Sequence, residues 1–135
     1  MTQPTSPLLT PMLTYADAPA AIDFLAKAFG FEELFRMQMP DGRIGHAEVG
    51  YDGLCVMLAS EYPTLGLESP RGFDARYSQI HVYVDDVDAH HDRARNAGAT
   101  IAAAPADQDH GDRMYRAMDP EGHRWIFSQR LEGSA

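Results

Sequence analysis

The sequence predicts a single α+β domain over residues 1–135, built from two successive β-α-β-β-β modules. The first observation is size, because 135 residues with 44% hydrophobic and 23% charged residues fit one ordinary globular domain. The second is that, in each half, stretches with strand periodicity flank one stretch with helical periodicity. The third is that the second half repeats the element order of the first half, which indicates an internal duplication.

The first module covers about residues 8–60 and is expected to begin with a strand in "LLTPMLTYAD". Asp17, followed by Ala18 and Pro19, predicts a helix start, because aspartate caps the first amides and proline is tolerated in the first turn. Gly30 supplies the C-terminal stop. Three strands joined by hairpins follow, in "ELFRMQM", "IGHAEV" and "LCVMLA".

The second module covers about residues 77–131 and repeats this order. A strand in "YSQIHVYV" precedes a helix opened by Asp85 or Asp86 and closed by Gly98. The strands "TIAAA", "RMYRAM" and "HRWIFSQ" follow, with "PADQDHGD" expected to form a loop after the first of them. Matching residues recur at nearly one displacement, with Tyr15, Asp17 and Gly30 repeated as Tyr83, Asp85 and Gly98.

Between the modules lies a segment of about residues 60–76, "SEYPTLGLESPRGFDAR". It is too long and too rich in Pro, Gly and Ser to be only a tight connection. Two interpretations stay open at this point, a passive linker or a lid over a site. Its aromatic residues Tyr62 and Phe73 are candidates to stack on a planar ligand.

Charge and composition exclude several classes of partner. The net charge of −9 and pI of about 4.9, without a Lys/Arg cluster, argue against nucleic acid and anionic membrane surfaces and leave a cationic small molecule open. Apolar runs are much shorter than the roughly 20 residues of a membrane helix, and the first residues lack a secretory signal. Cys55 is the only cysteine, which agrees with a reducing compartment, and a cytoplasmic location is expected.

The stretch "YSQIHVYVDD" combines two kinds of side chain in one expected strand. Ile80, Val82 and Val84 alternate with the polar side chains of its other face, so one face is apolar. The polar side chains belong to Gln79, His81 and Tyr83, which can hydrogen-bond or bind a metal. This face could meet bulk water, a metal ion or an enclosed ligand.

The two modules, each with a "DG" or "DPxG" turn before its last strand, resemble the vicinal oxygen chelate superfamily of glyoxalase I, bleomycin-resistance proteins and extradiol dioxygenases. The segments "AAIDFLAKAFGFEELFRM", "PDGRIGHAEV" and "DPEGHRWIF" are similar in particular to its PhnB-like glyoxalase/bleomycin-resistance subgroup. The resemblance covers nearly the whole chain. It implies curved mixed sheets around a cleft with helices outside, and a homodimer.

Within that fold, strand alternation assigns side chains to the cavity wall. The expected ligand-binding residues are Thr10, Met12, His46, Glu48, Met57, Gln79, His81, Tyr83, Tyr115 and Ile126, with Thr14 and Cys55 on the same faces. Trp125 and Phe127 have the opposite parity to Ile126 and are expected to pack against a helix.

The resemblance also implies four metal ligands, one His or Glu on each of the first, fourth, fifth and eighth strands. These positions hold Thr10, Met57, Gln79 and Ile126. Only the glutamine amide could coordinate, and it is a weak ligand for zinc or iron. We therefore expect no metal and no cofactor, and the Lewis acid of glyoxalase chemistry would be missing.

A non-standard metal site remains an alternative, assembled from His46, Glu48 and His81 in the manner of a two-His, one-carboxylate triad. The simpler interpretation is a hydrogen-bonded pair of His46 and Glu48 that orients the cavity wall. The remaining titratable candidates are expected to be inert. His90 and His91 are expected at the surface, His110 and His123 in solvent, and Cys55 as a buried thiol.

The leading functional hypothesis is a metal-independent protein that sequesters a small organic molecule, aromatic or cationic, such as a drug or metabolite. This is the mode of action of a bleomycin-type antibiotic-resistance protein. The alternative is a metal-dependent lyase, isomerase or dioxygenase-like enzyme that uses the non-standard site. Fold analogy cannot choose between them, because the superfamily hosts both classes.

Overall fold

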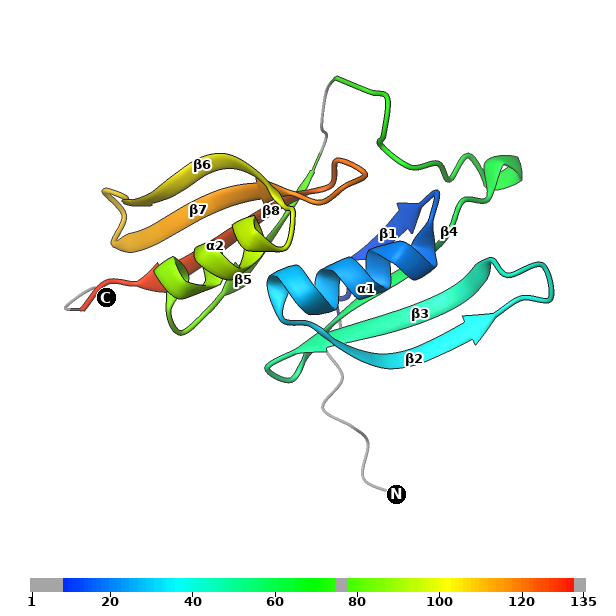
Figure 1. Cartoon of the computed structure of the whole chain (residues 1–135), viewed down its shortest axis with the longest axis horizontal. Helices are drawn as coiled ribbons and strands as arrows, with labels where there is room; N and C mark the ends of the chain where they lie inside the picture. The colour runs from blue at the N-terminus through cyan, green and yellow to red at the C-terminus, as the bar shows by residue number, and fades with distance from the viewer. Residues whose placement is uncertain (1–8, 75–77, 133–135) are drawn as a thin grey trace. The chain divides into compact units, whose positions relative to one another are not determined.

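The structure is a computed structural model that describes residues 9–74 and 78–132 (Figure 1). Its elements, in chain order, are β1 (Met12–Tyr15), α1 (Ala18–Phe29), β2 (Glu32–Gln38), β3 (Ile44–Tyr51), β4 (Leu54–Ser60), the short 3-10 turn η1 (Pro63–Leu65), β5 (Gln79–Tyr83), α2 (Val87–Asn96), β6 (Thr100–Asp107), β7 (Asp112–Met118) and β8 (Arg124–Arg130). The predicted tandem of two β-α-β-β-β modules is confirmed. Among the described residues, no helix is long and apolar enough to cross a membrane.

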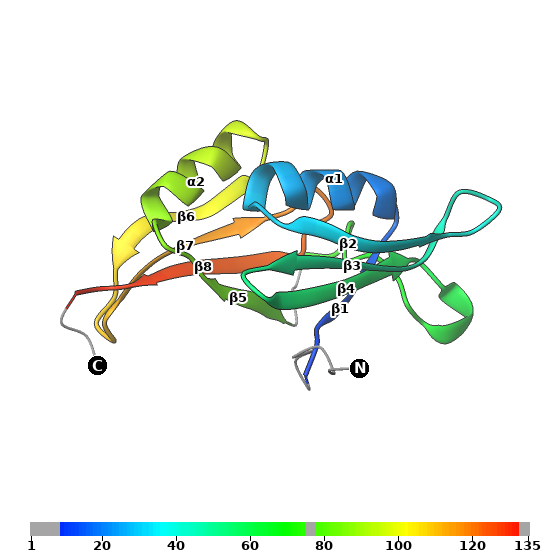
Figure 2. The ribbon, with the colours of Figure 1, turned by 90° about the horizontal axis from the view of Figure 1, so that it is seen from below.

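Contacts divide the chain into two compact units, residues 1–26 with 30–69 and residues 27–29 with 70–135. Each unit contains one four-stranded mixed sheet, with strand order β1-β4-β3-β2 in the first and β5-β8-β7-β6 in the second. The first pair in each order is parallel and the other pairs are antiparallel. In each unit the helix lies on one face of the sheet, so the other face carries no helix (Figure 2).

The helices begin where the sequence predicts. The Asp17 carboxylate accepts a hydrogen bond from the Ala20 amide at 3.1 Å, and Asp86 does the same for the Ala89 amide at 3.0 Å. Asp86, and not Asp85, is therefore the N-cap of α2. Helix α1 ends at Gly30, whose φ of 81° is the left-handed conformation that favours glycine.

A bulge in β3 decides which face each of its side chains meets. The pairing of β2 with β3 shifts register between Met37, opposite His46, and Gln38, opposite Ile44. The extra residue, Gly45, reverses the alternation at this end of the strand. Ile44 is consequently buried, although it has the same parity as His46 and Glu48.

The alternation in "YSQIHVYVDD" is confirmed, since Val82 and Val84 are buried while His81 and Tyr83 are exposed.

The internal repeat has a different displacement from the one that the tyrosines suggest. The two N-caps, Asp17 and Asp86, are 69 residues apart. At this displacement Tyr15 corresponds to Val84 and not to Tyr83. This explains why Tyr15 is fully buried while Tyr83 remains 42% exposed.

Strand β6 is longer than predicted. It continues through Pro105 to Asp107, into the segment expected to be a loop. The strand lies at the edge of its sheet, and its pairing with β7 has two register shifts. A proline is tolerated there, because an edge strand leaves part of its backbone amides unpaired.

Two predictions are wrong: His90 does not lie at the surface, and Tyr115 does not line the predicted cavity. The His90 ring is buried, with Nε2 donating to the Phe29 carbonyl at 2.9 Å and Nδ1 bonded to the Tyr115 hydroxyl at 2.5 Å. Tyr115 pairs with Phe127 in register and stacks on its ring, so both face α2. The His91 side chain is also only 12% exposed.

Trp125 and Phe127 are fully buried, as their parity predicts, and their rings are stacked at 6.1 Å. Phe29, which groups with the second unit, packs at 4.7 Å from the Phe127 ring. The aromatic cluster around His90 therefore forms the core of the second unit.

This environment predicts a pH-dependent stability. Burial lowers the pKa of His90 below its ordinary value. The hydrogen bond to Phe29 raises this pKa, and the positive charge of the nearby Arg93 lowers it further. The unfolded chain therefore binds this proton more readily, so the free energy of unfolding should fall as pH drops below about 6.5. Between about pH 7.5 and 5, the free energy of unfolding measured with urea should fall less for H90Q than for the native chain. An unchanged slope in H90Q would contradict this assignment.

Candidate functional site

The helix-free face of the first sheet brings together several of the predicted cavity residues. Met12 lies opposite Met57, Met57 lies opposite Glu48, and Glu48 lies opposite Phe35. These side chains therefore form one row across all four strands. Thr10 precedes β1 and is half-buried.

His46 and Glu48 form the hydrogen-bonded pair that the sequence suggests. His46 Nε2 lies 2.9 Å from a Glu48 carboxylate oxygen, and the two side chains are 29% and 32% exposed. The Phe35 ring lies 6.0 Å from the imidazole. The other Glu48 oxygen accepts from the Cys55 thiol at 3.8 Å. Burial, with the charge of Glu48, raises the pKa of Cys55, so the thiol stays protonated and is a poor nucleophile.

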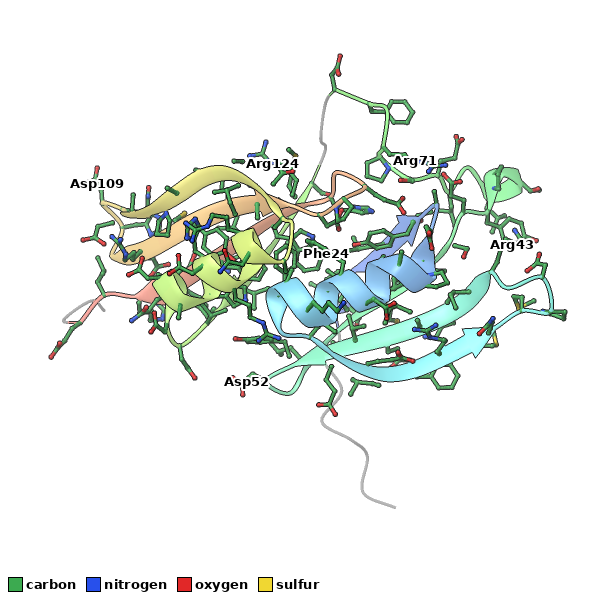
Figure 3. The ribbon with its side chains drawn as sticks, in the orientation of Figure 1. Phe24, Arg43, Asp52, Arg71, Asp109 and Arg124 are labelled. Atoms are coloured by element: carbon green, nitrogen blue, oxygen red, sulfur yellow. The ribbon has the colours of Figure 1, made fainter. Side chains whose placement is uncertain are left out.

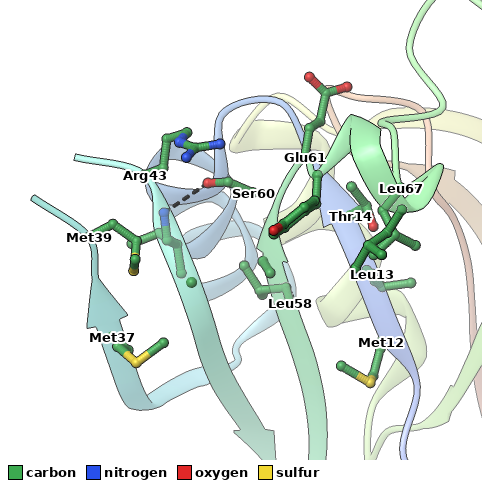
Figure 4. Close-up of a pocket in the computed structure, with 15 residues that line it drawn as sticks. Met12, Leu13, Thr14, Met37, Met39, Arg43, Leu58, Ser60, Glu61 and Leu67 are labelled. Atoms are coloured by element: carbon green, nitrogen blue, oxygen red, sulfur yellow. Dashed lines mark hydrogen bonds between the residues drawn. The ribbon is translucent and has the colours of Figure 1, made fainter. Parts of the chain in front are cut away.

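A cavity of about 440 Å³ lies at the end of this sheet (Figure 4). Its floor is formed by β1, β4 and the start of β3, with α1 behind the sheet. One wall is formed by Met37 and Met39, and the other by Tyr62, Leu65 and Leu67. The remaining lining residues are Met12, Leu13, Thr14, Arg43, Ile44, Gly45, Leu58, Ala59, Ser60 and Glu61. The lining is mainly apolar, with methionine and leucine side chains dominant.

The wall after β4 is an ordered part of the segment between the modules. The Tyr62 amide donates to the Leu67 carbonyl at 2.8 Å, and the Leu67 amide donates to the Tyr62 carbonyl at 3.2 Å. The Glu61 carboxylate accepts from the Ser69 amide at 2.8 Å. These bonds fold the start of the segment into a fixed wall of the cavity. Phe73 is exposed, belongs to the second unit and does not line this cavity.

The sequence predicts Met12, Thr14 and Tyr62 at the cavity but does not predict the wall residues Met37 and Met39. In a regular strand only one face of "ELFRMQM" would be available. The structure exposes nearly the whole of β2, which is an edge strand with two register shifts. Large apolar side chains in such a strand are the signal that could have indicated a binding surface.

The helix-free face of the second sheet is more polar. Ser128 Oγ hydrogen-bonds His81 Nε2 at 2.9 Å, and the Tyr83 hydroxyl donates to Asp112 at 2.8 Å. The Arg130 guanidinium lies 4.5 Å from the Tyr83 ring centre. Burial lowers the pKa of His81, while the bond to Asp112 raises the pKa of Tyr83. Both rings are therefore held in neutral forms near pH 7.

The residues at the expected ligand positions do not suit a divalent metal. The register places Met12 opposite Met57 and His81 opposite Ile126, whereas Gln79 lies opposite Arg124. Thioether and alkyl groups do not bind the hard or borderline cations that such sites hold. Within the described parts of the chain, no three His, Cys, Asp or Glu side chains gather in a way that could hold a metal.

The alternative triad spans the two units, with His46 and Glu48 in the first and His81 in the second. In the first unit the imidazole and the carboxylate are bonded to each other. In the second unit His81 is bonded to Ser128. Each part therefore has a partner of its own within its unit.

Comparison with known proteins identifies the family. The profile of the Glyoxalase/Bleomycin resistance protein/Dioxygenase superfamily matches residues 8–127. The chain belongs to this superfamily. An uncharacterized protein of Mycobacterium bovis is 44% identical over 126 residues, covering 91% of this chain and 83% of the relative. A lactoylglutathione lyase of Neisseria meningitidis is 27% identical over 134 residues, covering 93% and 92%.

Several solved structures share the fold. TioX from Micromonospora sp. ML1 is 34% identical, with a TM-score of 0.72 over 91% of this chain and 98% of that protein. Glyoxalase I from Zea mays has a TM-score of 0.74 at 21% identity and covers 92% of this chain and 44% of that one. The maize enzyme is thus similar in fold alone.

Gly45 offers a test of the cavity geometry. A Cβ atom at this position would lie 2.6 Å from Met37 Cε and 2.9 Å from Met39 Sδ, so both methionine ends would have to move. Because these are flexible side-chain ends, Gly45→Ala should change the melting temperature by only a few degrees. A crystal structure of the variant should show both methionines displaced. Unmoved methionines would contradict the described wall.

Proposed function

We propose that this chain is a metal-independent binding protein that captures a small planar, apolar molecule in the cavity of the first unit. The observation that carries the proposal is the cavity itself, with methionine walls on one side and Tyr62, Leu65 and Leu67 on the other. Thioethers adapt to ligands of irregular shape and contact aromatic rings favourably. Tyr62 adds a ring for stacking.

A neutral or cationic ligand suits the charges around the cavity. Arg43 is the only basic residue among the lining side chains, and it is bonded to Asp41 at 2.8 Å. Glu61 contributes a carboxylate, while the whole chain carries a net charge of −9. A ligand with a positive group is therefore favoured over an anion at this cavity.

Metal independence is supported by the ligand positions. Met57 and Ile126 offer no nitrogen or oxygen donor, and no other described side chains replace them as a cluster. Stoichiometric capture, without turnover, is supported by the titratable groups of the cavity. Glu61 is the one carboxylate among the lining residues, and it already accepts a hydrogen bond from the Ser69 amide. His46 and Glu48 are not among the lining residues, which supports binding over catalysis.

A lyase remains the second candidate, because a lactoylglutathione lyase is 27% identical over nearly the whole chain. Against it, the metal that glyoxalase chemistry needs finds no suitable ligand set among the described residues. A drug or metabolite as the ligand, membership of the PhnB-like subgroup and assembly as a homodimer belong to the same proposal. A particle of about twice the 14.9 kDa chain mass in light scattering would support the dimer.

Nile red, a neutral planar dye, is a suitable probe for the cavity. Its fluorescence should rise on binding to the native chain with saturation near one dye per chain. Leu65 lines the cavity and is 68% exposed, so Leu65→Asp should weaken the affinity about tenfold by removing apolar contact and introducing a charge. Leu54 is 59% exposed, in the same unit but outside the cavity, and Leu54→Asp is the matched control.

Dialysis against EDTA should leave the affinity for Nile red unchanged, because no metal takes part. Loss of binding after chelation, with recovery on adding zinc, nickel or manganese, would favour the lyase. Equal affinities of the two aspartate variants would place the dye outside the cavity and contradict the proposal.

A further inference from the structure

We propose that the helix-free face of the second sheet binds a small molecule through a carboxylate or phosphate group held between Arg116 and Arg124. This site is built only from residues of the second unit and does not depend on the proposed function. It rests on the register of β7 and β8 and on two arginines that have no partner among the described residues.

The register places both arginines on one face. Arg116 lies opposite Ile126, and Arg124 lies opposite Met118, so the two arginines are diagonal neighbours. Diagonal neighbours in a sheet are about 7–8 Å apart, within reach of long side chains. The residues that alternate with them, Ala117 and Trp125, are buried on the face that α2 covers. The guanidinium groups therefore share the helix-free face.

Within residues 9–74 and 78–132, Arg116 and Arg124 differ from the other arginines in having no partner; Arg124 is labelled in Figure 3. Among the residues that the structure describes, Arg36 contacts Glu33, Arg43 contacts Asp41 and Arg93 contacts the Lys27 carbonyl. Arg95 contacts Asp92, Arg113 contacts Asp88 and Asp107, and Arg130 contacts the Tyr83 ring. Arg71 is engaged as well. Neither Arg116 nor Arg124 has such a contact within the described residues. Both are half-buried.

This is unusual in a chain with 20 acidic and 11 basic residues, where carboxylates are abundant. The buried carboxylates on β7 and just beyond it are already engaged. Asp112 accepts from Tyr83, and Asp119 accepts from the Trp125 indole at 3.2 Å and from two backbone amides at 3.1 Å. Two like charges held close together on one face repel each other, so an oxyanion between them would relieve this repulsion.

The neighbouring side chains complete a small site. Strand β5 pairs with the other edge of β8, where Gln79 lies opposite Arg124 and His81 lies opposite Ile126. The glutamine amide and the imidazole supply polar edges. Guanidinium forks bind carboxylate and phosphate oxygens in pairs, so two of them suit a dianion such as a phosphate or a dicarboxylate. A long polyanion is disfavoured by the net charge of −9.

Isothermal titration calorimetry with inorganic phosphate and with succinate tests the site, with neutral succinamide as the uncharged control. At least one of the two anions should bind with saturation, and its affinity should fall with added NaCl. Arg116→Gln and Arg124→Gln should each weaken binding about tenfold or more. Arg95→Gln should bind like the native chain, since Arg95 lies on α2 and is paired with Asp92. Circular dichroism establishes that each variant is folded.

Binding of phosphate without succinate would assign a phosphate-bearing ligand, and the reverse would assign a dicarboxylate. Two results would overturn the site: no saturable heat with either anion, or unchanged affinity in both arginine variants. Neither result bears on the Nile red titration, because that dye is neutral and its cavity lies in the first unit.

Discussion

A four-stranded sheet that is covered by one helix has one buried face and one face left without a helix, and this asymmetry governs both units. Side chains alternate between the two faces, so each strand contributes both to the core and to the opposite surface. In "YSQIHVYVDD" the valines stabilise the second unit, while His81 and Tyr83 lie on the other face. The chemistry of each unit is thus set by residues that the core does not require.

The two helix-free faces have different characters, although the modules share one topology. The first carries Met12, Met57 and Phe35 around a single His46–Glu48 pair and ends in an apolar cavity. The second carries arginines and hydrogen-bonded aromatic side chains. An internal duplication that keeps the core and changes only the alternate positions can therefore hold two kinds of ligand surface on one scaffold.

The elements and their caps could be predicted because they depend on local sequence, as Asp17, Asp86 and Gly30 illustrate. The misplaced residues depend on pairing between strands. Tyr115 faces α2 because β7 pairs it with Phe127, and this register cannot be read from β7 alone. The cavity likewise depends on the bulge at Gly45 and on the exposed strand β2. Simple alternation of side chains therefore does not predict the cavity methionines.

We propose that the ligand face of the first unit works through apolar side chains and not through a metal. Methionine-methyl NMR tests it most directly, because the chain has seven methionines and they lie on both units. Adding Nile red to metal-free protein should shift the resonances of Met12, Met37 and Met39, which line the cavity, and leave Met114 and Met118 of the second unit in place. Shifts confined to Met114 and Met118, or no shift until a metal is added, would contradict the account.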